Sequence, residues 1–119
     1  MDNKLFRIAV ASGDGIVVNQ HFGKCSTFFI YQVDEEEKIH FAEKRNVLPV
    51  CEGGNHDETR LKDNLETIKD CRYLLVSRIG NTAAVIAESF GIESYEIPGI
   101  IEESIEQLIK YIKIKNLFT

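Results

Sequence analysis

The feature that most constrains the fold is a change in the spacing of apolar residues about halfway along the chain. Up to residue 47, apolar residues occur in short runs or alternate with polar residues, which is typical of β-strands. Beyond residue 57, Leu61, Leu65 and Ile68 recur at i, i+4 and i+7 and form one stripe along a helix. Strands and helices then alternate to the end of the chain. The pattern predicts an α/β protein that begins with strands alone.

Five strands are predicted, each bounded by turn residues or by a change of pattern. They are Leu5–Ala11, Thr27–Val33, Ile39–Val47, Tyr73–Ser77 and Ile92–Ile97. The charged turn at 34–38 joins the second and third strands into a hairpin. Alternation along the third strand places Ile39, Phe41 and Val47 together on one face and leaves His40 on the other.

Three helices are predicted between and after the later strands. The first starts near residue 57, where Asn55 or Asp57 can cap it. The second opens at Gly80-Asn81 and runs through Glu88, and Gly91 is placed to close it.

The last helix carries an apolar stripe, and residues 113–119 beyond it are expected to be a frayed end. The stripe consists of Ile105, Leu108, Ile109 and Ile112. Three strands followed by helix–strand–helix–strand–helix predict one domain, residues 1–119, with a mixed five-stranded sheet covered by helices.

Composition excludes several classes of protein. The net charge of −5 disfavours a general nucleic-acid binder, which would need a broad basic face. No apolar run approaches the roughly 18 residues of a membrane span, and the polar start lacks the apolar core of a signal peptide. An odd number of cysteines, Cys25, Cys51 and Cys71, without Cys-x-x-Cys, favours reduced thiols. We therefore expect a cytoplasmic protein that binds neither membranes nor nucleic acids.

The loop after the first strand contains residues able to bind a metal. His21 offers a neutral imidazole and Cys25 a thiolate, both of which are ligands for iron or zinc. Gly23 lets the backbone turn sharply or approach a bulky ligand, and Lys24 could lower the pKa of the Cys25 thiol. The structural alternatives are a surface histidine bonded to a carbonyl and a half-buried cysteine at a strand entrance.

A second loop, after the third strand, contains Cys51 and His56 on either side of Gly53-Gly54. The glycines could wrap a cluster or let backbone amides reach an anion, or they could simply allow a flexible crossover. If the third strand runs parallel to the first, both loops leave the same edge of the sheet and form one site. Cys71, which opens an apolar strand, is expected to be a core residue.

Four basic residues could line an anionic ligand, although each taken singly is more simply a solvated surface charge. These residues are Lys24, Arg45, Arg60 and Arg78.

The order of these motifs resembles the dinitrogenase iron-molybdenum cofactor biosynthesis family, which includes NifX-type carriers and the carboxy-terminal domain of NifB-type cofactor synthases. The resemblance covers about residues 5 to 97, and its most specific element is His21-Phe22-Gly23. The other matching segments are Ile8-Ala-Val-Ala-Ser12, Asp14-Gly15, Cys51-x-Gly53-Gly54, Asp70-Cys71, Val76-x-x-Ile79-Gly80 and Ala87-x-x-x-Gly91-Ile92. It implies a ribonuclease-H-like fold and cluster binding through His21. From the residues of the two loops, we expect Phe22, Gly23, Lys24, Gly53 and Gly54 to lie around the cofactor.

The leading hypothesis is a small carrier, not an enzyme, for an iron–sulfur cofactor or an iron-molybdenum cofactor precursor. Its partners would be the proteins that donate and receive the cluster, and His21, Cys25, Cys51 and His56 would be the metal ligands. One alternative is a zinc- or redox-responsive Cys/His interaction module. Another is a metal-dependent nuclease, which is disfavoured because the strand at 5–11 carries no acidic residue.

Overall fold

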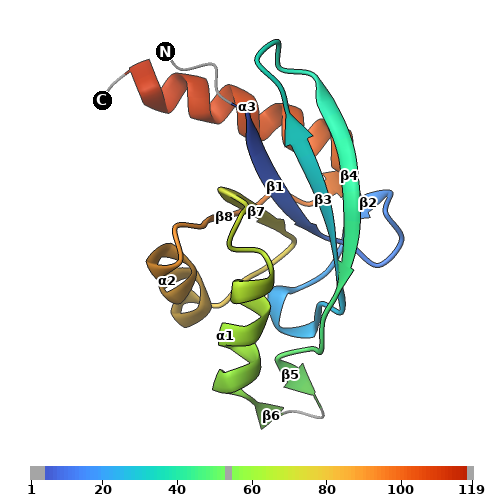
Figure 1. Cartoon of the computed structure of the whole chain (residues 1–119), viewed down its shortest axis with the longest axis vertical. Coiled ribbons are helices and arrows are strands. Elements are labelled where there is room, and N and C mark those ends of the chain that lie inside the picture. Colours follow the sequence, from blue (N-terminus) through green and yellow to red (C-terminus); the bar gives the residue numbers. More distant parts are fainter. Residues whose placement is uncertain (1–4, 53–54, 118–119) are drawn as a thin grey trace.

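The computed structural model describes residues 5–52 and 55–117, and the side chains of 52, 55 and 56 are not part of that description. Five strands form one mixed sheet in the order β4-β3-β1-β7-β8 (Figure 1). Their bounds are β1 Phe6–Ala11, β3 Thr27–Val33, β4 Ile39–Asn46, β7 Tyr73–Val76 and β8 Glu93–Glu96. β3 is antiparallel to both β1 and β4, whereas β7 is parallel to both β1 and β8. The predicted five-stranded mixed sheet is confirmed, while the ribonuclease-H-like label stays a prediction.

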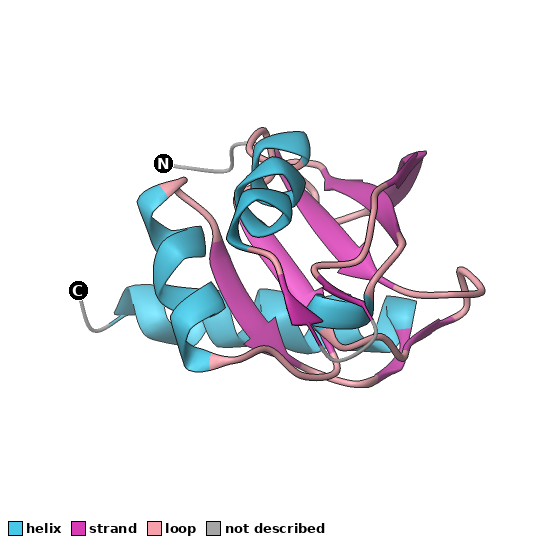
Figure 2. Ribbon diagram, turned by 90° about the horizontal axis from the view of Figure 1, so that it is seen from below, coloured by secondary structure: helices cyan, strands magenta, loops and turns pink. Residues whose placement is uncertain are grey.

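Helices cover both faces of the sheet, as Figure 2 shows. α1 (Glu58–Thr67) and α2 (Asn81–Ser89) pack on one face, and α3 (Ile101–Leu117) packs on the other. β1 lies at the centre of both contacts, because Ala9 faces α1 and α2 while Ile8 faces α3, and both are fully buried. The nearly continuous apolar sequence of this strand follows from burial on both faces.

Local signals in the sequence define where two of the helices start and end. The Asp57 carboxylate accepts hydrogen bonds from the backbone N–H groups of Thr59 (2.9 Å) and Arg60 (3.2 Å), so Asp57 is the N-cap of α1. Gly91 has a φ of +80°, a conformation that ends α2 and that a side chain would strain. Both ends agree with the prediction.

A β-bulge changes the faces that the sequence predicts for β4. The register moves from Ile30 opposite Glu43 to Tyr31 opposite Phe41, which leaves Ala42 as an extra residue. Phe41 therefore contacts Tyr31 on the α3 side, whereas Val47 packs against the cluster under α1 and α2. The prediction that Val47 shares a face with Phe41 is wrong, because one extra residue inverts the alternation beyond it.

The expectation of a frayed carboxyl end from residue 113 is also wrong as far as Leu117, where α3 ends. Two ion pairs connect this part of the helix to the rest of the protein. Lys113 lies 3.0 Å from Glu37 in the β3–β4 turn, and Lys115 lies 3.5 Å from Glu93 of β8. The end of α3 therefore contacts residues far away in the sequence, and the local sequence does not reveal these contacts.

Shorter elements complete the fold. β2 (Val17–Val18) pairs with β9 (Gly99–Ile100), and β5 (Cys51–Glu52) pairs with β6 (Asn55–His56). A single 3-10 turn, η1 (Phe22–Lys24), follows β2. None of the helices within the described ranges has the length and apolar character that crossing a bilayer requires.

Candidate functional site

The loop with His21 is anchored by the residue that follows it. Phe22 is buried, with 2% of its surface exposed, and its ring lies 6.2 Å from that of Phe28 in β3. Backbone hydrogen bonds from Lys24 to His21 (3.1 Å) and from Cys25 to Phe22 (3.2 Å) close the η1 turn. His21 itself is exposed. The buried ring of Phe22 thus anchors the η1 turn, while the imidazole of His21, the residue before it, faces solvent.

The same loop is joined to the end of β7. His21 and Arg78 form a parallel β-bridge, in which the N–H of Phe22 donates to the carbonyl of Arg78 (2.8 Å). On the other side of the bridge, the N–H of Ser77 donates to the carbonyl of Gln20 (3.0 Å). His21 therefore lies on an extension of the sheet, beyond the carboxyl ends of β1 and β7. In open α/β sheets this edge is a common place for ligand binding.

The second Cys/His loop meets the first one at Gly23. A Cβ atom built on Gly23 would lie 2.8 Å from Sγ of Cys51, so the thiol occupies space that any other residue at 23 would need. The chain leading to Cys51 is held on α1, because Asn64 donates to the carbonyl of Leu48 (2.7 Å) and Arg60 to that of Pro49 (3.3 Å). β4 runs parallel to β1, as the convergence of the loops requires.

Cys25 is placed differently from Cys51. Its side chain is fully buried, and Sγ donates to the carbonyl of Thr27 at 3.0 Å. Burial raises the pKa of the Cys25 thiol to about 11, so the expectation that Lys24 lowers it is wrong. A cluster could reach this thiol only if the surrounding structure opened.

The other predicted residues of the second loop are described only in part or not at all. Gly53 and Gly54 lie outside the described residues. His56 is described through its backbone, which pairs with Cys51 in the β5–β6 ladder. Cys71 is buried, with 1% of its surface exposed, which agrees with its expected place in the core.

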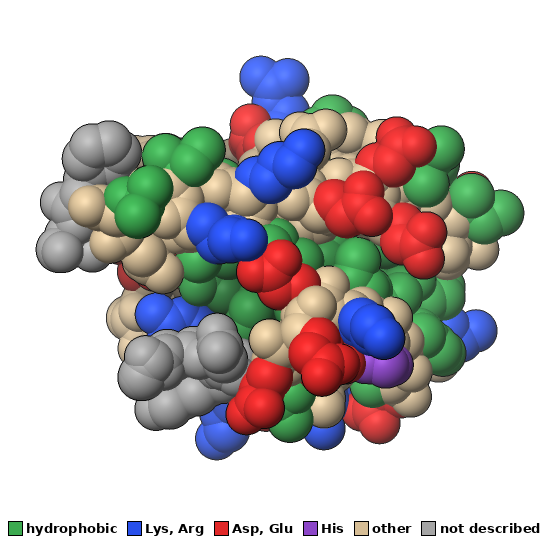
Figure 3. Space-filling view, turned by 90° about the horizontal axis from the view of Figure 1, so that it is seen from above, with side chains coloured by type: hydrophobic (Ala, Val, Ile, Leu, Met, Phe, Trp, Pro, Cys, Tyr) green, Lys and Arg blue, Asp and Glu red, His purple; other side chains and the backbone are tan. Residues whose placement is uncertain are grey.

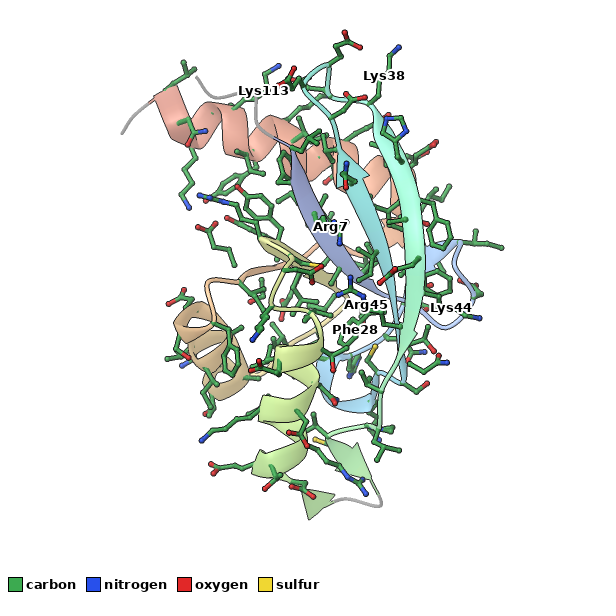
Figure 4. The ribbon with its side chains drawn as sticks, in the orientation of Figure 1. Arg7, Phe28, Lys38, Lys44, Arg45 and Lys113 are labelled. Atoms are coloured by element: carbon green, nitrogen blue, oxygen red, sulfur yellow. The ribbon has the colours of Figure 1, made fainter. Side chains whose placement is uncertain are left out.

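The four basic residues considered as anion contacts differ in their surroundings. Arg45 binds the carboxylate of Asp70 through both terminal nitrogens (2.7 and 2.9 Å), and Arg7 donates to the same carboxylate (2.8 Å). Arg7 and Arg45 are labelled in Figure 4, on β1 and β4. Arg60 lies 3.7 Å from the Asp57 carboxylate and donates to the Pro49 carbonyl. Arg45 and Arg60 therefore serve the structure.

Lys24 and Arg78 remain exposed near His21. Lys24 is the last residue of η1, and Arg78 is the bridge partner of His21. Sequence reasoning gave Arg78 no particular weight. Its position just after the parallel strand next to β1 is the signal that could have singled it out.

The turn between β7 and α2 continues this edge. The N–H of Ile79 donates to the Glu96 carboxylate (2.9 Å), which holds the turn in place. Gly80 is the N-cap of α2 and provides no side-chain hydrogen bond, and a Cβ atom on it would meet nothing within 4 Å. The backbone N–H groups in the first turn of α2 therefore lie beside open space, where they favour the binding of a negatively charged group.

Among the described side chains, few metal donors come together. Within residues 5–52 and 55–117, no three His, Cys, Asp or Glu residues come together in a way that could hold a metal ion. On the end of the molecule that carries α3 and the β3–β4 turn, acidic and basic side chains are interspersed (Figure 3). The exposed imidazole of His21 and the Cys51 thiol against Gly23 thus offer a ligand two donor residues from neighbouring loops.

Comparison with known proteins places the chain among proteins of cofactor biosynthesis. A family model described as "Dinitrogenase iron-molybdenum cofactor" matches residues 4–111. The FeMo cofactor biosynthesis protein NifB of Chlorobaculum tepidum is 32% identical over 110 residues, which are 92% of this chain and 25% of that protein. Protein NifY of Klebsiella pneumoniae is 35% identical over 77 residues, 64% of this chain and 31% of NifY. The chain thus spans about a quarter to a third of these relatives.

Solved structures share the fold. The crystal structure of PH0822 has a TM-score of 0.62 and 25% sequence identity, and the match covers 87% of this chain and 90% of that one. An NMR structure from Thermotoga, described as belonging to the DUF35 family, has a TM-score of 0.54 and 20% identity, with 88% of each chain covered.

Proposed function

The chain belongs to the dinitrogenase iron-molybdenum cofactor family, and from this premise we propose that it is a small cytoplasmic carrier without enzymatic activity. Its cargo would be an iron–sulfur cofactor or an iron-molybdenum cofactor precursor, which it would hold during metallocluster biosynthesis or transfer. The NifB relative from Chlorobaculum tepidum is a FeMo cofactor biosynthesis protein, and this chain corresponds to about a quarter of its length.

One observation carries the proposal: the loops with His21 and Cys51 converge at Gly23. The Cys51 thiol lies against the glycine that is two residues from His21, although the two loops follow different strands. An imidazole and a thiol are suitable ligands for iron in a cluster. This convergence supports His21 and Cys51 as ligands of one site at the carboxyl ends of β1 and β4.

The small number of donors among the described side chains suits transient binding. Permanent iron–sulfur sites are usually closed by four cysteines. Here Cys25 and Cys71 are buried, and the described residues contain no set of three metal donors. A preassembled cluster that keeps most of its own ligands could bind through His21 and Cys51 and leave again. This is the behaviour that a carrier between a donor and a recipient protein requires.

Anaerobic titration with a synthetic water-soluble iron–sulfur cluster, followed by visible absorbance, tests the proposal. We expect His21→Ala to weaken binding at least about tenfold, which corresponds to about 1.4 kcal/mol. Cys51→Ala should weaken it less. His40→Ala is the matched control, because His40 is an exposed histidine that pairs with Asp34 (2.8 Å) in the β3–β4 hairpin.

The folded state should tolerate His21→Ala, because the imidazole is exposed and the Phe22 anchor stays in place. Equal cluster affinity of the wild type and His21→Ala would overturn the proposed site. A colourless protein that binds zinc and takes up no cluster would instead favour the Cys/His interaction module.

A further inference from the structure

We infer that Arg78 is the residue that recognises the negative charge of the cargo bound at His21. This inference rests on the proposed function and adds a specificity-determining residue to the same site. It starts from the His21–Arg78 bridge, which pairs the backbones of an exposed histidine and an exposed arginine at the carboxyl edge of the sheet.

The bridge fixes the relative position of the two side chains. Residues paired in adjacent strands project to the same side of a sheet, because side chains alternate between faces along each strand. The hydrogen bonds from Phe22 N–H to the Arg78 carbonyl (2.8 Å) and from Ser77 N–H to the Gln20 carbonyl (3.0 Å) join the two segments around the bridge. A ligand that reaches the imidazole of His21 therefore lies within the range of the Arg78 side chain.

The surroundings leave the Arg78 side chain available. Among the described residues, no hydrogen bond or ion pair of its guanidinium group occurs, whereas Arg45 is engaged by Asp70 and Arg60 lies by Asp57. Its backbone carbonyl, in contrast, is used by the loop of His21. The main chain of Arg78 thus builds the site, and its side chain remains exposed to whatever binds there.

The charge of the cargo gives this position its function. Iron–sulfur cofactors with thiolate or sulfide ligands are anions, and the whole protein carries a net charge of −5, so attraction must be local. A guanidinium group beside a ligand bound at His21 would act inside the Debye length of about 10 Å at 0.1 M salt. The N-terminus of α2, which starts three residues after Arg78, adds partial charge of the same sign.

Three variants separate this role from a general effect of charge. Arg78→Gln removes the charge at the site, and Arg78→Lys retains it. Arg72→Gln is the matched control, because Arg72 is an exposed arginine at the opposite end of β7, beside Tyr73. The probe is a dianionic four-iron four-sulfur cluster with hydroxyethanethiolate ligands, titrated anaerobically at several salt concentrations.

We expect Arg78→Gln to weaken binding about fivefold at low salt and to make the affinity less dependent on salt. Arg78→Lys should stay within about twofold of the wild type, and so should Arg72→Gln. His21→Ala should lose affinity while keeping the salt dependence of the wild type, because it removes a ligand and not a charge.

The outcomes distinguish the two ideas. If the wild type binds the cluster and His21→Ala weakens binding, but Arg78→Gln behaves like Arg72→Gln, the role of Arg78 is wrong and the carrier site stands. If the wild type does not bind the cluster, the proposed function fails, and the inference about Arg78 fails with it. Should Arg78→Gln unfold, an Arg78→Lys variant that folds but loses affinity and salt dependence would equally contradict recognition by charge.

Discussion

Sγ of Cys51 lies so close to Gly23 that a Cβ atom on the glycine would be 2.8 Å away from it. Gly23 belongs to the loop that follows β1, and Cys51 belongs to the loop that follows β4. These strands lie on either side of β3 in a three-strand meander. Because β1 and β4 are both antiparallel to β3, their carboxyl ends lie at the same edge. This contact between a thiol and a glycine is what makes two separate loops one candidate site.

The first prediction is that Gly23→Ala destabilises the protein through this contact. Gly23 does not have a positive φ, so the cost is steric: the new methyl group and the Cys51 side chain would need the same space. We expect a loss of about 1–3 kcal/mol in the free energy of unfolding, measured by urea denaturation. The cluster affinity should fall as well, because the loop of His21 must move.

Cys51→Ala supplies the control for this substitution. Shortening the side chain at 51 removes the atom that a methyl group on residue 23 would meet, so the double variant should recover most of the loss. If Gly23→Ala costs the same in both backgrounds, the close approach of the two loops is not the source of the effect.

The second prediction concerns which thiol reacts in the native protein. Burial raises the pKa of Cys25 to about 11 and that of Cys71 to about 12, so neither is a thiolate near neutral pH. Cys51 is half-buried and lies at the converging loops. Iodoacetamide at about pH 8 should therefore modify Cys51 first, as determined by peptide mass spectrometry.

Full modification of all three cysteines in urea would serve as the reference for this experiment. Rapid labelling of Cys25 in the folded protein would contradict the prediction. It would also show that the structure around Cys25 opens, which is the condition under which Cys25 could bind a cluster.

The third prediction concerns Asp70, which joins β1 and β4 through Arg7 and Arg45. The neighbouring Arg45 guanidinium holds the pKa of Asp70 well below its usual range. At neutral pH we expect Asp70→Asn to cost about 1 kcal/mol, a modest value because the Asp70 side chain is 43% exposed and solvent screens the pairs. Asp63→Asn, which changes an exposed aspartate of α1, should have little effect.

The loss should depend on pH with a defined sign. A carboxylate with a lowered folded-state pKa stabilises the protein fully above its unfolded pKa of about 4, and the stabilisation is lost as the pH falls toward the folded pKa. The difference between the wild type and Asp70→Asn in urea denaturation should therefore shrink from about pH 5 to about pH 3. A difference that grows on acidification would show that Asp70 is not stabilised as an anion.

The sequence by itself determined the elements and their order, because these depend on local physics. Alternation and apolar runs located the strands, the stripe of Leu61, Leu65 and Ile68 located α1, and Asp57 and Gly91 marked helix ends. The resemblance in the segment around His21-Phe22-Gly23 led to the family that comparison establishes. Each of these signals acts within a few residues or within one strand face.

Only the tertiary structure decided which side chains are available. Cys25 is a possible ligand in the sequence, but the fold buries its thiol and thereby raises its pKa. Arg45 and Arg78 are equivalent cations in the sequence, yet Asp70 engages the first, whereas a β-bridge places the second beside His21. Burial, strand register and the bulge at Ala42 arise from contacts between segments far apart in the chain, so no local pattern of residues encodes them.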